Sequence, residues 1–86
     1  PMAKVTMYTK TMCPFCIRAM HLLKGKDVDV EEIPAAFDAE KKQEMIDRSG
    51  GRRTFPQIFI GDEHIGGCDD LLTLERAGKL DAMLEA

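Results

Sequence analysis

Tryptophan is absent from the 86-residue sequence, and no apolar run approaches the roughly 20 residues that a membrane-spanning helix needs. The N-terminus lacks the basic, then apolar, then small-residue order of a secretory signal, so we expect a cytoplasmic protein. Basic residues are not in excess, because 12 lysines and arginines stand against 15 acidic residues, for a formal charge of −3. Nucleic-acid binding needs a basic field, so we expect neither nucleic acid nor a membrane as partner.

The length of the chain is suited to one compact domain and is too short for two. Hydrophobic residues make up 44% and charged residues 31% of the sequence, which excludes a disordered or a membrane class. We therefore expect residues 1–86 to form a single domain that acts as a monomer. Pro1, which precedes Met2, is interpreted as a remnant of expression.

Periodic patterns of apolar residues predict eight secondary-structure elements. Strands are expected over 4–9, 28–33, 57–60 and 63–65. Helices are expected over 13–24, 38–48, 69–76 and 79–84. The first helix has apolar residues at helical spacing, from Ile17 to Leu23, and Gly25 is its expected C-terminal cap.

The order of these elements predicts an α/β fold. Strand, helix and strand at this spacing indicate a right-handed βαβ unit with parallel strands. Gly61-Asp62 is a turn signal that joins the last two strands as a hairpin. The complete order describes a four-stranded mixed sheet, with strand order 2-1-3-4, flanked by helices on its faces.

Three cysteines are too few and too unevenly placed for a secreted disulfide scaffold. Cys13 and Cys16 form a Cys-x-x-Cys pair beside the βαβ pattern, which is typical of a thioredoxin-like redox protein. Cys13 stands just before the first helix, where free N–H groups and the helix dipole stabilise a thiolate, the nucleophile of disulfide exchange. Cys16 follows about one helical turn later. We predict that Cys13, exposed and with Lys10 nearby, attacks and that Cys16 resolves the mixed disulfide.

Zinc binding and a purely structural role are two alternatives for the cysteine pair. A structural zinc site needs about four ligands, and the remaining candidates, Cys68, His21 and His64, repeat no paired spacing. No metal is therefore expected. Cysteines with a purely structural role are the other alternative. Pro14 at the start of the helix argues against it, because this start places Cys13 where a thiol becomes reactive.

Three motifs, in this order and spacing, resemble the glutaredoxin family over nearly the whole chain, from Val5 to about Leu80. They are Tyr8 to Cys16 with its Cys-Pro-Phe-Cys core, Thr54-Phe55-Pro56, and Gly66-Gly67-Cys68-Asp69-Asp70. The first motif resembles the dithiol class of small bacterial-type glutaredoxins. Thioredoxin itself fits less well, because it typically carries a tryptophan before its own motif. The family usually has Tyr where Phe15 stands and Val where Phe55 stands.

The resemblance implies a glutathione-dependent thiol–disulfide oxidoreductase without a tightly bound cofactor. Glutathione would be the co-substrate, and glutathionylated or disulfide-containing proteins would be the partners. Pro56 would be a cis-proline facing the cysteines, and the backbone of Phe55 would bind glutathione as an added strand. The implied glutathione-binding residues are Lys10, Phe15, Gln43, Arg53, Thr54, Phe55, Pro56, Gly67, Cys68 and Asp69.

The resemblance leaves several roles open. The loop 50–53 is one residue longer than in similar bacterial members, so either Arg52 or Arg53 reaches glutathione. Cys68 is a third redox thiol or a small residue that fills space behind the site. Asp70 contacts the ligand or caps the third helix. Some relatives share an iron–sulfur cluster through their first active cysteine and glutathione, but Pro14 stiffens the motif and argues against that role.

Overall fold

The computed structural model describes residues 3–86, so the interpretation of Pro1 falls outside the described residues. The elements are β1 (Val5–Thr9), α1 (Pro14–Gly25), β2 (Val30–Pro34), α2 (Ala39–Arg48), β3 (Gln57–Ile60), β4 (Glu63–Gly66), α3 (Cys68–Arg76) and α4 (Leu80–Glu85). All eight predicted elements are present, and their ends differ from the prediction by at most two residues.

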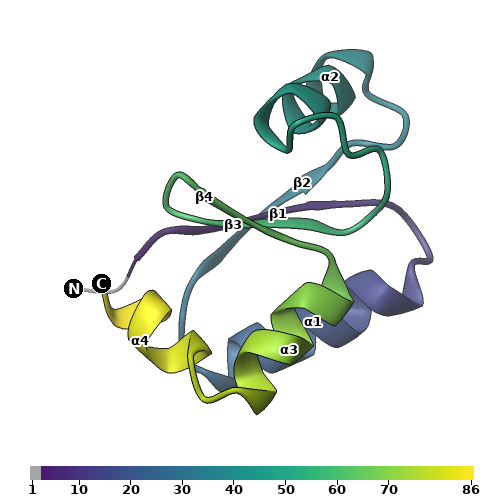
Figure 1. Cartoon of the computed structure of the whole chain (residues 1–86). Coiled ribbons are helices and arrows are strands. Elements are labelled where there is room, and N and C mark those ends of the chain that lie inside the picture. The colour runs from purple at the N-terminus through teal and green to yellow at the C-terminus, as the bar shows by residue number, and fades with distance from the viewer. Residues whose placement is uncertain (1–2) are drawn as a thin grey trace.

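The four strands form one mixed sheet in the order β2-β1-β3-β4, which confirms the predicted fold class. β1 pairs with β2 in parallel, as the βαβ pattern requires, and the other two pairs are antiparallel. Helix α2 covers one face of the sheet, and α1, α3 and α4 cover the other (Figure 1). The cysteine motif follows β1 and forms the N-cap and first turn of α1.

The alternation of side chains along the central strands builds a core on each face of the sheet. Val5 of β1 and Ile58 of β3 pack in the larger core with residues of α1, α3 and α4. Tyr8 and Phe59, on the same two strands, point to the other face and pack against Met45 of α2. A shift of one residue in strand register would therefore turn the side chains of that strand to the opposite face of the sheet and disrupt both cores.

Two details of α1 differ from the prediction. Ile17 is 68% exposed, because the buried face of the helix carries Cys16, Ala19 and Leu23 and Ile17 lies about 100° away from Cys16. Gly25 is the last helical residue and not the left-handed cap. The chain turns away two residues later, at Asp27, which has a φ of 64°. Aspartate adopts this conformation more readily than most residues.

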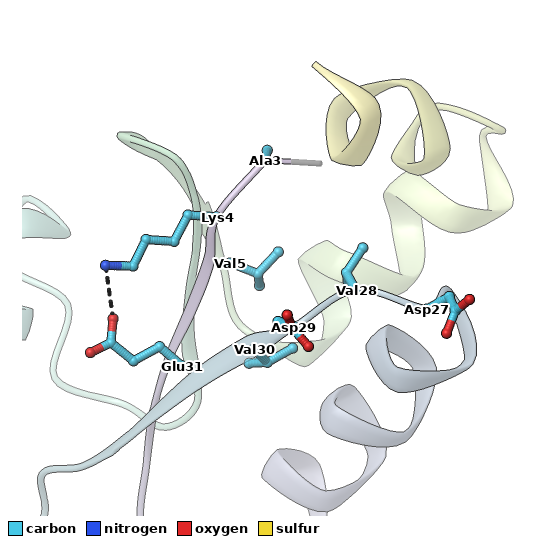
Figure 2. Close-up of a pocket in the computed structure, with 8 residues that line it drawn as sticks. All are labelled: Ala3, Lys4, Val5, Asp27, Val28, Asp29, Val30 and Glu31. Atoms are coloured by element: carbon cyan, nitrogen blue, oxygen red, sulfur yellow. Dashed lines mark ion pairs between the residues drawn. The ribbon is translucent and has the colours of Figure 1, made fainter. Parts of the chain in front are cut away.

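Figure 2 shows a pocket of about 550 Å³ at the edge of the sheet where β1 begins, at the opposite end of that strand from the cysteine motif. Lys4 forms an ion pair with Glu31 there at 3.1 Å, and both side chains are exposed, so the pair contributes little stability. Glu31 and Pro34 lie on β2, an edge strand, where charge and proline oppose pairing with another sheet.

None of the helices between residues 3 and 86 has the length and apolar content that crossing a bilayer requires.

Candidate active site

Cys13 is the N-cap of α1, as the sequence predicts. Its Sγ accepts a hydrogen bond from the Cys16 N–H at 3.2 Å, and Pro14 occupies the first turn. A sulfur in this position faces the positive end of the helix. The prediction that Cys13 is exposed is wrong, because its side chain is only 3% exposed. The capping bond holds the sulfur against the end of the helix.

Cys16 differs from Cys13 in its electrostatics, although it is equally buried. Burial raises the pKa of the Cys16 thiol to about 12, with a further contribution from its hydrogen bond to Cys13, while the backbone and charge of Lys10 oppose the shift. A thiol with this pKa is protonated at neutral pH and is a poor first nucleophile. The geometry therefore supports the unequal roles predicted for the pair, with Cys13 as the attacking group.

The second motif brings a cis peptide bond to the site. The Phe55–Pro56 bond is cis, as the resemblance implies. Pro56 is buried at the floor of a groove of about 310 Å³, and its carbonyl oxygen lies close to Gly67. The groove brings together seven of the ten residues predicted to bind glutathione: Phe15, Thr54, Phe55, Pro56, Gly67, Cys68 and Asp69.

Three predicted residues lie elsewhere. Lys10 lines a separate pocket with Cys13 and Cys16. Gln43 is exposed on α2, and its Nε2 donates to Asp47 Oδ1 at 2.8 Å. Arg53 is exposed and does not line the groove. These residues remain predictions, but the groove as folded does not include them.

Arg52 occupies the place predicted for Arg53. Its guanidinium lies 3.9 Å from Asp70 Oδ2 at the edge of the groove. The loop is fastened by Ser49, whose Oγ accepts from the Arg52 N–H at 3.0 Å and donates to the Arg52 carbonyl at 3.2 Å. Arg52, not Arg53, therefore lines the groove.

Helix α3 begins at the groove, and Asp70 caps it. The Gly67 N–H donates to Asp70 Oδ2 at 2.9 Å, so capping, one of the two roles left open for Asp70, is present. Gly66 has a φ of 116°, and a Cβ placed there would lie 2.2 Å from the same oxygen. This cap requires glycine at position 66. The remaining N–H groups of the first turn form an anion-binding end that faces the groove.

A hydrogen-bonded pair, Gln57 and His64, lies next to the groove and was not predicted from the sequence. The Gln57 side chain is fully buried, and its Nε2 donates to the Thr54 carbonyl at 3.0 Å and to Thr54 Oγ1 at 3.1 Å. Its Oε1 accepts a hydrogen bond from His64 Nε2 at 2.7 Å. The signal was a polar residue at the start of an otherwise apolar strand, and only the structure shows its partners.

Replacement of Gln57 with methionine is expected to lower the free energy of unfolding by about 2–3 kcal/mol, because the Thr54 carbonyl and His64 Nε2 lose their partner. Urea denaturation would measure it. Gln43→Met is the matched control, since Gln43 is exposed and makes one hydrogen bond, so about 0.5 kcal/mol or less is expected. Equal effects of the two changes would show that the hydrogen-bonded pair does not support the loop.

Comparisons with known proteins agree with this geometry. The sequence model of the glutaredoxin family matches residues 5–65. The chain belongs to the glutaredoxin family. It is 54% identical over 84 residues to glutaredoxin 3 of Escherichia coli K12, covering 98% of this chain and 100% of that protein. The solution structure of a glutaredoxin from Brucella melitensis is 52% identical, with a TM-score of 0.83, covering 98% of this chain and 90% of that one.

A third comparison concerns a glutaredoxin with a ligand. The crystal structure of a buckwheat glutaredoxin–glutathione complex is 30% identical, with a TM-score of 0.84, covering 95% of this chain and 76% of that one. Family membership makes this glutaredoxin a thiol–disulfide oxidoreductase with a thioredoxin-like fold. The Cys-x-x-Cys pair at the start of α1 is its redox-active centre.

Cys68 begins α3 at the wall of the groove and is 4% exposed. Burial raises the pKa of its thiol, Arg18 opposes the shift, and the negative charges of Asp69 and Cys13 add to it. A buried, protonated thiol packed in the larger core is a poor redox group. Of the two roles left open for Cys68, packing is therefore favoured over redox chemistry.

Within residues 3–86, no group of three or more histidine, cysteine or acidic side chains lies close enough to hold a metal.

Proposed function

We propose that this glutaredoxin reduces glutathione mixed disulfides and protein disulfides, with glutathione as the electron donor. The observation that carries the proposal is the groove beside the redox pair. It combines a helix N-terminus, a cis-proline strand edge and an arginine. Phe15 of the Cys-x-x-Cys motif lines the groove, and the charge of Cys13 contributes to the raised pKa of Cys68, another lining residue.

The groove matches the chemistry of glutathione, a short peptide with two carboxylates and one ammonium group. The N–H groups at the start of α3 suit the γ-glutamyl carboxylate, and the Asp69 carboxylate suits the ammonium. The Phe55 backbone next to the cis bond suits the cysteinyl unit, in the manner of strand addition. Arg52 suits the glycine carboxylate.

In the monothiol route, the Cys13 thiolate attacks the glutathione sulfur of a mixed disulfide. A bond forms between Cys13 Sγ and glutathione, the substrate sulfur–sulfur bond breaks, and the substrate leaves as a thiolate that takes a proton from water. A second glutathione thiolate then attacks the glutathione sulfur on Cys13. Oxidised glutathione leaves, and the Cys13 thiolate is restored.

In the dithiol route, Cys13 attacks a protein disulfide and holds one of its sulfurs in a mixed disulfide. Cys16, after losing its proton to water, attacks Cys13 Sγ, and the protein leaves as a dithiol. Two glutathione molecules then reduce the Cys13–Cys16 bond and are oxidised to one disulfide. Burial keeps the pKa of Cys16 high, and formation of the mixed disulfide removes the charge of Cys13, which makes a smaller contribution to that pKa.

Glutathione should support turnover of a small mixed disulfide about tenfold or more faster than equimolar N-acetylcysteine, because N-acetylcysteine lacks the γ-glutamyl and glycine units that carry the carboxylates of glutathione and has only the carboxylate of its own cysteine. One charge-assisted hydrogen bond alone accounts for about a factor of ten. The measurement is the steady-state rate of disulfide reduction with each thiol, corrected for its uncatalysed reaction. Equal corrected rates would contradict glutathione recognition by the groove.

We also propose that the chain acts in the cytoplasm as a single-domain monomer. Three cysteines, two of them in one close pair, are too few for a secreted disulfide scaffold, which supports a reducing compartment. Both cores are built on one sheet, which supports a single domain.

A further inference from the structure

Large hydrophobic side chains are exposed beside the redox pair. Four such side chains are exposed in the described chain, and three of them fall within residues 12–17: Met12 at 90%, Phe15 at 57% and Ile17 at 68%. A concentration of exposed apolar surface around a reactive group marks a site of interaction. Phe15 lines the groove described above, but Met12 and Ile17 do not.

Met12 and Ile17 line a second pocket of about 450 Å³, together with Met20. Both Cys13 and Cys16 also line this pocket, so a molecule bound in it contacts the redox pair. It shares no lining residue with the groove proposed for glutathione. The two cysteines thus line this pocket, whereas Phe15, which lies between them in the sequence, lines the groove.

The charges of this second pocket are unbalanced. Lys10 and Lys24 line it, and neither forms an ion pair within residues 3–86. The one carboxylate of the pocket, Glu32, accepts a hydrogen bond from Thr9 Oγ1 at 2.9 Å. An occupant with an apolar side chain and a carboxylate therefore complements the pocket.

The pocket follows one flank of α1, and α3 packs on the same face of the sheet beside that helix (Figure 1). Ile17, Met20 and Lys24 lie four, seven and eleven residues after Cys13, which places them along one side of the helix. The distance from Cys13 to Lys24 along the axis is about 16 Å at the rise of an α-helix. An extended peptide covers that distance in about five residues.

We propose that this pocket binds the segment next to the reactive cysteine of a disulfide-containing protein substrate. The preferred segment carries an apolar side chain two or three residues from that cysteine, against Ile17 and Met20, and a carboxylate about five residues away, paired with Lys24. The proposal rests on the proposed function, since it assigns the protein side of the same redox centre.

The test uses the Cys16→Ser variant, which stops at the first mixed disulfide. Peptides with one cysteine are activated as mixed disulfides with thionitrobenzoate. The Cys13 thiolate attacks the peptide sulfur, the peptide–thionitrobenzoate bond breaks, and the coloured thionitrobenzoate anion leaves. One peptide carries leucine two or three residues and aspartate about five residues from cysteine, both on the same side of it. A second has lysine in place of aspartate, and a third has serine in place of leucine.

The acidic peptide is expected to react about 3–10-fold faster than the lysine peptide, the range for gaining an exposed charge pair and avoiding a repulsion. The difference should shrink in high salt. Adding Lys24→Glu should remove or reverse this preference, and adding Ile17→Ser should remove the preference for leucine over serine. Arg76→Glu is the matched charge control, because Arg76 also lies exposed in the last turn of a helix and should leave the preference intact.

Equal rates for all three peptides would overturn the proposal, as would equal effects of Lys24→Glu and Arg76→Glu. The wild-type rate with a small glutathione mixed disulfide separates this failure from failure of the proposed function. Glutathione-dependent turnover of that substrate without peptide discrimination rejects only the second pocket. Loss of that turnover in the wild-type protein rejects the proposed function.

Discussion

Replacement of Cys13 with serine is expected to abolish reduction of both a small glutathione mixed disulfide and a protein disulfide, with each rate falling by roughly a thousandfold or more. Both proposed routes begin with attack by Cys13 Sγ, which sits at the N-cap of α1. A serine hydroxyl can cap the helix equally well, so the fold is kept, but it stays protonated at neutral pH and does not attack sulfur.

The partner change, Cys16→Ser, is expected to separate the two routes. Turnover of the small mixed disulfide should persist, because only Cys13 and a second glutathione take part. Reduction of a protein disulfide should fall to the level that glutathione alone supports, because the resolving thiol is gone. A glutathione-coupled assay with each substrate measures both rates for the two variants.

Cys68→Ser is the matched control for loss of a buried thiol. Neither route includes a bond to Cys68, so both are expected to operate in this variant, with any change confined to the affinity of the groove wall for glutathione. Undiminished turnover by Cys13→Ser would overturn the proposed function. Loss of the dithiol route in Cys68→Ser alone would assign a redox role to the third cysteine.

The second large effect is expected at Gly66. Gly66→Ala should lower the free energy of unfolding by about 2–4 kcal/mol, the sum of an unfavourable backbone conformation and a lost helix cap. The φ of 116° is one that alanine rarely adopts, and the new Cβ would meet the Asp70 carboxylate at 2.2 Å. Asp70 must then move, which frees the Gly67 N–H and shifts Arg52 at the groove.

Gly78→Ala separates the two causes. Gly78 also has a positive φ, of 72°, but a Cβ there meets no atom within 4 Å. Its replacement is expected to cost about 1–2 kcal/mol from the backbone alone. Guanidinium denaturation measures stability, and the KM for glutathione measures the groove. Gly66→Ala should raise that KM and Gly78→Ala should not. Identical results for the two variants would mean that the Asp70 cap does not shape the groove.

Local patterns in the sequence predicted most of the fold. Period-two and helical spacings predicted all eight elements, because each strand and helix must turn its apolar side toward a core. The place of Cys13 before Pro14 predicted an N-cap, since capping depends on residues within a single turn. The cis bond at Pro56 was implied by a resemblance and not by local physics.

The surroundings of the redox pair depended on contacts between distant segments. The sequence predicted an exposed Cys13, yet this residue is buried. Lys10 was predicted to bind glutathione, yet it lines the other pocket. Gln57 and His64, which support Thr54, received no functional role from their sequence positions. Each outcome depends on how helices and loops pack across the sheet, and a pattern of neighbours along the chain contains no such information.

By itself, the sequence determined a mixed sheet with helices on both faces and a cysteine pair at the start of the first helix, because both follow from short-range periodicity and capping. The tertiary structure decided which residues share a surface with that pair. It buried Cys13, raised the pKa of the Cys16 thiol and placed Arg52, not Arg53, in the groove. It also opened a second surface along α1, because burial and proximity arise only when separate elements pack together.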